Sequence, residues 1–207
     1  MKPKEGRMKE LLRERGLDGA IVSSPENFHY VTGFGGHQHT VSRQPGFTLA
    51  VMRSDDKAPT HITTMDFEAA TFRIKSAGLG FVVDPYDTWV GLKTWPEISQ
   101  GAALPDKARM ESSADKLEQF VKACDLADKR IGVEMDYLTV PYYNMIREKF
   151  PEARLVDISD LFVYARSIKT EEEIKMFREL CRIADHGFTQ VSRMAGIGVS
   201  EKEMSDC

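Results

Sequence analysis

The chain has 207 residues, and 42% of them are hydrophobic, which is enough to fill the core of one domain of ordinary size and leaves further chain over. Its 28 basic and 32 acidic residues give a net charge of −4. That balance argues against the basic footprint of a nucleic-acid-binding protein and against a polybasic membrane patch.

The N-terminus and the cysteines bear on the cellular compartment. The charged start, M-K-P-K-E-G-R-M-K-E, is not followed by the apolar segment of a signal peptide, and no run of residues is long and apolar enough to span a bilayer. The three cysteines, Cys124, Cys181 and Cys207, are odd in number and far apart. We therefore expect a reduced, cytoplasmic protein.

The hydrophobic pattern predicts alternating helices and strands in the first half of the chain. These are a helix over residues 5–16, a strand over 17–23, a helix from Pro25 to about Thr32, strands over 47–53 and 60–64, a helix over 65–76 and a strand over 80–83. Ser24 and Pro25 favour a helix start, because serine caps free N–H groups and proline suits the first helical position. A polar turn joins the two strands over 47–64, which predicts an antiparallel pair.

The second half continues the alternation after an irregular segment over 84–109. It predicts a helix over 110–129, a strand over 131–134, a helix over 140–150, a strand over 153–158 and a short helix from 157 to about 166. Strands that alternate with helices predict an α/β fold in which a mixed sheet is covered by helices on both sides. The irregular segment holds Trp89 and Trp95, which favour an interface or a substrate lid, or else anchor the segment to its own domain.

The final part of the chain predicts two further helices. Thr170 and Glu173 form a capping box, and apolar residues then recur at alternating spacings of three and four. These residues are Ile174, Phe177, Cys181, Ala184, Phe188, Val191 and Ala195. Ser200 and Glu203 form a second capping box, with little chain left before Cys207. Because so short a helix is not stable by itself, we expect this chain to be the front part of a longer protein.

Three segments of the sequence resemble the creatinase and Xaa-Pro peptidase family. They are G-L-D-G-A-I-V-S-S-P-E-N-F-H-Y-V-T-G-F near the N-terminus, R-I-G-V-E-M-D-Y-L followed by F-P-E-A-R-L-V-D-I-S-D-L in the middle, and A-R-S-I-K-T-E-E-E-I followed by R-I-A-D and G-V-S-E-K-E near the end. In that family an N-terminal α/β domain precedes a catalytic domain with the pita-bread fold. The resemblance implies a creatinase-like N-terminal domain over residues 1–165, and a linker with the opening helices of a truncated catalytic domain over 166–207.

The resemblance also implies a function. The chain would be the non-catalytic N-terminal domain of a hydrolase that acts on C–N bonds, of Xaa-Pro dipeptidase, aminopeptidase P or creatinase type. Its roles would be contacts within a homodimer and the mouth of a site for a small-molecule or peptide substrate. The alternative is a stand-alone or degenerate family member that acts as a binding or dimerisation module. Neither interpretation involves nucleic acid or a membrane.

The hydrolytic residues of the family are not expected in this chain. Metallopeptidase members use two aspartates, a histidine and two glutamates to hold two divalent ions, such as Mn, Co or Zn, whereas creatinase uses no metal and a histidine as general acid and base. Neither set can be placed here, so we predict no catalytic residue, metal ligand or cofactor in this stretch. Asp185 and His186 are adjacent on a predicted helix and point in different directions, so we expect them on its solvated face.

Residues 33–47 are the segment in which the resemblance implies substrate contacts. In creatinase an arginine shortly before a proline and the following strand helps to bind the carboxylate of the substrate from the other subunit. Arg43, two residues before Pro45, is similarly placed, with one extra residue between them. A guanidinium can bind a carboxylate through two parallel hydrogen bonds, so substrate binding by Arg43 is one interpretation and an exposed loop arginine is the other.

His37 and His39 precede Arg43 in the same segment. Separated by one residue, they would face the same way in an extended loop. Substrate contact, metal binding and plain surface histidines are all open, although no carboxylate or cysteine lies close in sequence to complete a metal site. We predict Arg43, His37 and His39 as substrate-binding residues. The glycine run over 33–36 lacks the patterns of phosphate-binding loops, so we expect it to be a flexible hinge.

Overall fold

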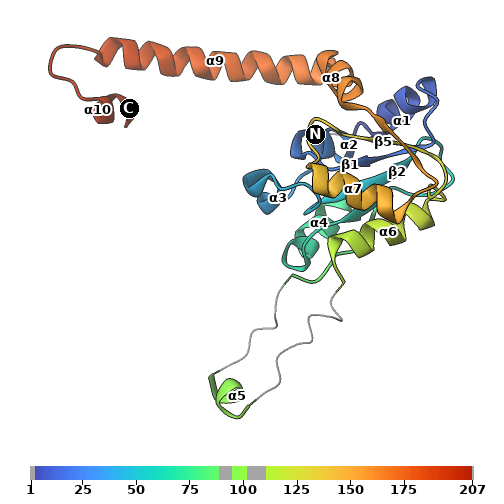
Figure 1. The fold of residues 1–207 in the computed structure, drawn as a ribbon. Helices are drawn as coiled ribbons and strands as arrows, with labels where there is room; N and C mark the ends of the chain where they lie inside the picture. The colour runs from blue at the N-terminus through green and yellow to red at the C-terminus, as the bar shows by residue number, and fades with distance from the viewer. Residues whose placement is uncertain (1–2, 89–94, 102–110, 207) are drawn as a thin grey trace. The chain divides into compact units, whose positions relative to one another are not determined.

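A mixed β-sheet lies at the centre of the fold (Figure 1). The structure is a computed structural model that describes residues 3–88, 95–101 and 111–206, and the chain divides into two compact units, residues 1–165 and 166–207. In the described part of the first unit, six strands are ordered β4-β3-β2-β1-β5-β6. They are β1 (Gly19–Val22), β2 (Leu49–Arg53), β3 (His61–Thr63), β4 (Val82–Val83), β5 (Arg130–Val133) and β6 (Arg154–Asp157).

Strand β1 pairs antiparallel with one neighbour and parallel with the other. β1 pairs antiparallel with β2, which pairs antiparallel with β3, whereas the pairs β3–β4, β1–β5 and β5–β6 are parallel. The register places Gly19 opposite Ile131 and Ile21 opposite Val133 in the pair β1–β5. The predicted mixed sheet and the predicted antiparallel pair between residues 47 and 64 are therefore confirmed.

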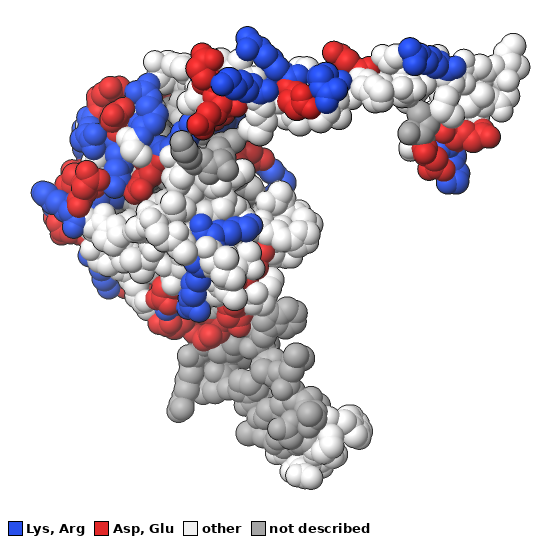
Figure 2. Space-filling model, turned by 180° about the vertical axis from the view of Figure 1, so that it is seen from behind, with Lys and Arg blue, Asp and Glu red and all other residues white. Residues whose placement is uncertain are grey.

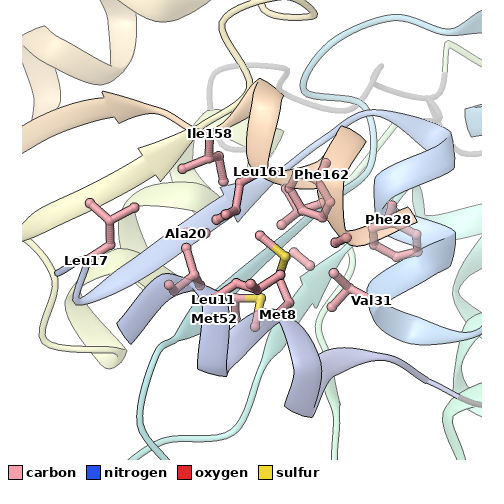
Figure 3. Close-up of a cluster of buried hydrophobic side chains, with 14 of the residues drawn as sticks. Met8, Leu11, Leu17, Ala20, Phe28, Val31, Met52, Ile158, Leu161 and Phe162 are labelled. Carbon is pink, nitrogen blue, oxygen red and sulfur yellow. The ribbon is translucent and has the colours of Figure 1, made fainter. Parts of the chain in front are cut away.

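Helices cover both faces of the sheet and enclose two hydrophobic cores. The first core involves α1 (Glu5–Glu14), α2 (Pro25–Thr32), α4 (Ala69–Ser76) and α8 (Ser159–Ser167), and the second involves α6 (Ser113–Ala123) and α7 (Val140–Lys149). Side chains of β1 alternate between them, because Ala20 and Val22 belong to the first core and Ile21 to the second. Figure 3 shows the first core, to which α1 contributes Met8 and α2 contributes Phe28. Each fully buried large side chain stabilises the fold by about 1.5–3 kcal/mol.

Local sequence determines the two ends of α2. The Ser24 hydroxyl accepts a hydrogen bond from the backbone N–H of Asn27 at 3.4 Å, and Pro25 occupies the first turn. Gly33 ends the helix in the left-handed conformation, with φ of 80°, which glycine adopts without steric cost. The predicted bounds of this helix are therefore confirmed.

Several predicted segments differ from the structure. Residues 37–42, expected in an extended loop, form the short helix α3 (His37–Ser42). Residues 95–99, expected to be irregular, form α5 (Trp95–Ser99), while 89–94 and 102–110 lie outside the described residues. The helix expected over 65–76 begins as the 3-10 turn η1 (Asp66–Glu68), and the strand expected over 80–83 is confined to β4.

The second unit contains α9 (Glu171–Met194) and α10 (Glu201–Ser205). Both predicted capping boxes are present, at Thr170 and at Ser200. Apolar side chains of α9 are exposed within this unit, among them Phe177 and Phe188, which are 50% and 75% accessible. No helix in the described part of the chain combines the length and the apolar composition that crossing a bilayer requires.

We expect Gly46→Ala to destabilise the protein more than Gly78→Ala. Both glycines have positive φ, of 85° and 76°, so a side chain costs about 1–2 kcal/mol at either position. A Cβ at Gly46 would also lie 2.2 Å from Cε2 of Tyr142, which adds an overpacking cost of about 1–3 kcal/mol. At Gly78 a Cβ would meet no described atom within 4 Å. Urea unfolding of both variants measures the difference, and equal losses would contradict the clash.

Candidate functional site

A buried polar cluster lies where the parallel strands β1 and β5 end. Ser23 and Ser24 directly follow β1, and Glu134 directly follows β5. Neighbouring parallel strands end at the same edge of a sheet, so these residues meet although Ser23 and Glu134 are 111 residues apart in sequence. The strand-end cluster, as we name it, consists of Ser23, Ser24, Asn27, His39 and Glu134.

Glu134 is fully buried, and hydrogen-bond donors at the start of α2 surround its carboxylate. Oε2 accepts hydrogen bonds from the backbone N–H groups of Ser23 and Ser24, the latter at 3.0 Å. Oε1 accepts from the Ser24 hydroxyl and from Nδ2 of Asn27, the latter at 2.6 Å. Burial raises the pKa of Glu134, and the hydrogen bonds oppose this rise. The carboxylate therefore joins the end of β5 to the start of α2.

His39 connects α3 to the same cluster. Its Nε2 lies 2.7 Å from the carbonyl oxygen of Ser23, and because a carbonyl can only accept, Nε2 carries the proton and donates it. His39 is 1% exposed, and its ring packs edge-on against Phe28, with ring centroids 5.3 Å apart. Nδ1 is buried without a hydrogen-bond partner among the described residues. Burial lowers the pKa of His39, so the imidazole is held in its neutral form.

Glu68, in η1, holds the N-terminal end of α3. Its Oε1 accepts a hydrogen bond from the backbone N–H of Gln38 at 3.0 Å. A carboxylate is favourable there because the N-terminal end of a helix carries partial positive charge. Gly36 precedes the helix, and a Cβ at that position would lie 2.5 Å from Oε2 of Glu68. Glycine at position 36 therefore allows the carboxylate to approach the helix end.

Arg43 ends α3 and forms a two-point ion pair with Glu26 of α2. Nη1 lies 2.6 Å from Oε1 and Nη2 lies 3.1 Å from Oε2, while both side chains are about half exposed. The carboxylate of Glu26 raises the pKa of the Arg43 guanidinium, which stays charged. Exposed ion pairs contribute little to stability. The guanidinium can therefore exchange this carboxylate for that of a ligand.

The predicted substrate-binding residues differ in accessibility. Arg43 and His37 are exposed, whereas His39 is buried. The expectation that the two histidines face the same way is wrong, because residues 37–42 are helical and side chains two positions apart on a helix point about 200° apart. His39 is also not a plain surface histidine. Substrate contact stays a prediction for all three residues, and His39 has a structural contact with the strand end.

Other residues considered from the sequence lie elsewhere. Trp95 is 77% exposed on α5, and Trp89 lies outside the described residues. Asp185 and His186 are exposed on α9, as expected. The sequence interpretation missed Glu134 and Glu26. A glutamate directly after the apolar residues of a strand was the available signal for Glu134, whereas nothing in the sequence singled out Glu26.

On the face shown in Figure 2, basic and acidic side chains are interspersed. Within the described ranges, no group of three His, Cys, Asp or Glu side chains could hold a metal ion. The described residues therefore do not fit the metal pair of metallopeptidases.

Removing the Glu134 side chain should strongly destabilise the first unit. We expect Glu134→Ala to lower the free energy of unfolding by about 2–4 kcal/mol, because it leaves buried N–H and O–H donors unpaired. Glu134→Gln should cost less, since its amide oxygen can still accept from the two backbone N–H groups. Urea unfolding measures both, with Glu152→Ala as a surface control. A loss no larger than that of the control would show that the network contributes nothing.

His39 should make stability depend on pH between about pH 5.5 and 7.5. The folded-state pKa is lowered below 6.5, so the unfolded chain binds more protons, and stability should fall as pH drops through 6.5. The slope is at most about 1.4 kcal/mol per pH unit. The test compares unfolding free energies of the unmodified chain and His39→Gln across this range, with His37→Gln as control. An identical pH dependence in His39→Gln and the unmodified chain would contradict the assignment.

Comparisons with known proteins identify relatives of this fold. Residues 6–168 match the family model described as the Creatinase/Prolidase N-terminal domain. The uncharacterized peptidase YqhT of Bacillus subtilis (strain 168) is 28% identical over 196 residues, which cover 94% of this chain and 44% of that protein. Creatinase from Bacillus sp. (strain B-0618) is 34% identical over 76 residues, which cover 37% of this chain and 18% of creatinase.

A solved structure agrees with the sequence comparisons. A dipeptidase from Pyrococcus horikoshii OT3 matches this chain with a TM-score of 0.68 and 21% sequence identity. The match covers 96% of this chain and 46% of the dipeptidase chain, and it shows a shared fold. The chain spans less than half the length of YqhT and of this dipeptidase. Because the family match extends over residues 6–168, the chain belongs to the creatinase/prolidase family through the N-terminal domain of that family.

Proposed function

We propose that this chain is the non-catalytic N-terminal domain of a larger creatinase- or Xaa-Pro-peptidase-type hydrolase. The family match over residues 6–168 carries the proposal, together with the 44% of YqhT that the chain covers. In this proposal the hydrolytic groups, and any metal ions that they hold, belong to the rest of the whole protein. Residues 166–207 begin that catalytic part, and the exposed apolar face of α9 packs against it.

The first unit would form part of the mouth of the substrate site, with Arg43 as the residue that contacts the substrate. Its guanidinium is exposed, permanently charged and already oriented by a carboxylate, that of Glu26. The geometry that binds Glu26 at two points suits a substrate carboxylate equally well. His39 and Glu68 fix the helix that presents this guanidinium, so little ordering would be needed on binding.

His37 would be a second contact, and the site would be completed across a homodimer. His37 is exposed at the first position of α3, six residues before Arg43, and the accessibility of its imidazole supports the proposal. The family resemblance supports the further proposal that α3 extends over the active site of a partner subunit. Creatine and Xaa-Pro dipeptides both carry the carboxylate that Arg43 would bind.

In the whole protein, Arg43→Ala should raise KM at least about tenfold with kcat much less affected, because it removes charge-assisted hydrogen bonds to a substrate carboxylate. Arg43→Lys should recover part of the loss, since lysine keeps the charge but not the two-point geometry. Steady-state kinetics are measured with an Xaa-Pro dipeptide in the presence of Mn²⁺ and with creatine in its absence.

The matched control is Arg130→Ala, because Arg130 is exposed at the opposite end of β5 from the strand-end cluster. Equal KM values for the Arg43 and Arg130 variants would rule out substrate contact by Arg43. Absence of hydrolysis of either substrate by the whole protein would favour the other interpretation, a degenerate member that acts as a binding or dimerisation module. Sedimentation of the whole protein then tests dimerisation separately.

A further inference from the structure

A cleft of about 750 Å³ lies beside α2 in the first unit, on residues that the proposed substrate contacts do not use. Pro25 and His29 line it from α2, one helical turn apart. Phe34 and Gly35 line it from the chain after α2, and Lys75 and Leu79 line it from α4 and the turn that follows. The volume lies within the usual range of small-molecule sites, about 300–1,000 Å³.

The cleft contains basic groups with unused hydrogen-bonding capacity. Nζ of Lys75 donates to the carbonyl oxygen of Gly35 at 3.0 Å, which orients the ammonium group. No carboxylate in the described part of the chain lies within ion-pair distance of it, so its other N–H groups remain available for a ligand. His29 is exposed on α2, and no hydrogen bond of its ring is found among the described residues.

Apolar side chains form part of the remaining wall, and Phe34 is fixed in place. Phe34 belongs to an aromatic cluster, with ring centroids 6.1 Å from Phe28 and 5.5 Å from Phe72. Because Phe34 is 7% exposed and its ring packs against two other rings, it forms a rigid wall. Leu79 is 40% exposed and offers apolar surface that a ligand would bury.

We propose that this cleft binds a small organic monoanion, a carboxylate carried on an apolar body. Lys75 and His29 would receive the carboxylate, and Phe34, Pro25 and Leu79 would contact the apolar part. A single lysine suits one negative charge better than the two charges of a phosphate, because the carboxylate of Glu26 also lies on the cleft and repels added negative charge. Glu26 is engaged by Arg43, which disfavours a cationic ligand. The inference does not depend on the hydrolase activity proposed above.

The test is a titration of the ¹⁵N-labelled 207-residue chain with phenylacetate at pH 7 and constant ionic strength, followed by amide chemical shifts. We expect saturable shifts at Gly33, Gly35 and Lys75. Lys75→Gln should weaken binding about tenfold, because it removes the charge that pairs with the carboxylate. Lys75→Arg should keep most of the affinity. Lys57→Gln, an exposed lysine in the turn between β2 and β3, is the matched control and should leave affinity unchanged.

Probes of different charge distinguish the ligand classes. Benzyl alcohol should bind more weakly than phenylacetate, since it keeps the ring and lacks the charge. Equal binding of the two, or equal affinity in Lys75→Gln and Lys57→Gln, would overturn the role of Lys75. Inorganic phosphate that binds at the same amides more tightly than phenylacetate would overturn the organic-acid class. Absence of saturable shifts with every probe would overturn the site itself. Far-ultraviolet circular dichroism confirms that each variant is folded.

Discussion

The arrangement of the candidate site depends on one buried carboxylate, that of Glu134, at the point where two parallel strands end. A buried acid is costly unless it is hydrogen-bonded, and the start of α2 supplies donors to both of its oxygens. Ser23 participates twice, because its N–H donates to Glu134 and its carbonyl accepts from His39. Ser23 therefore joins the end of β1 to α3 through His39, and α3 carries Arg43 at its C-terminal end. The substrate contact proposed for this family member is thus connected to the core.

Much of the fold could be predicted because its signals are local. Ser24 and Gly33 determine the ends of α2 through contacts within a few residues, and the capping boxes at Thr170 and Ser200 mark α9 and α10 in the same way. Hydrophobic periodicity then predicts the order of strands and helices along the chain. The alternation of strands with helices predicts the sheet, which the structure shows to be mixed.

The site was less predictable because its contacts join distant parts of the sequence. α3 is too short to show a helical period, and its stabilising contacts come from Glu68 and Ser23, which lie 30 and 16 residues away from their partners. A glutamate after a strand is ordinarily solvated, and Glu134 is buried only because β1 places the start of α2 over it. Arg43 was singled out as a candidate through the family resemblance, whereas its partner Glu26 became evident only in the structure.

The two-sided pairing of β1 has a consequence for the order of folding. On its antiparallel side β1 joins strands that follow it earlier in the chain than β5 does, so less loop entropy is lost when β1, β2 and β3 associate. On its parallel side β1 pairs with β5, which is separated from it by a long stretch of sequence. Non-local pairings of this kind form slowly. We therefore expect the antiparallel strands to associate before β5 joins them, and the hydrogen bonds at the start of α2 to be completed only when β5 brings Glu134 to it.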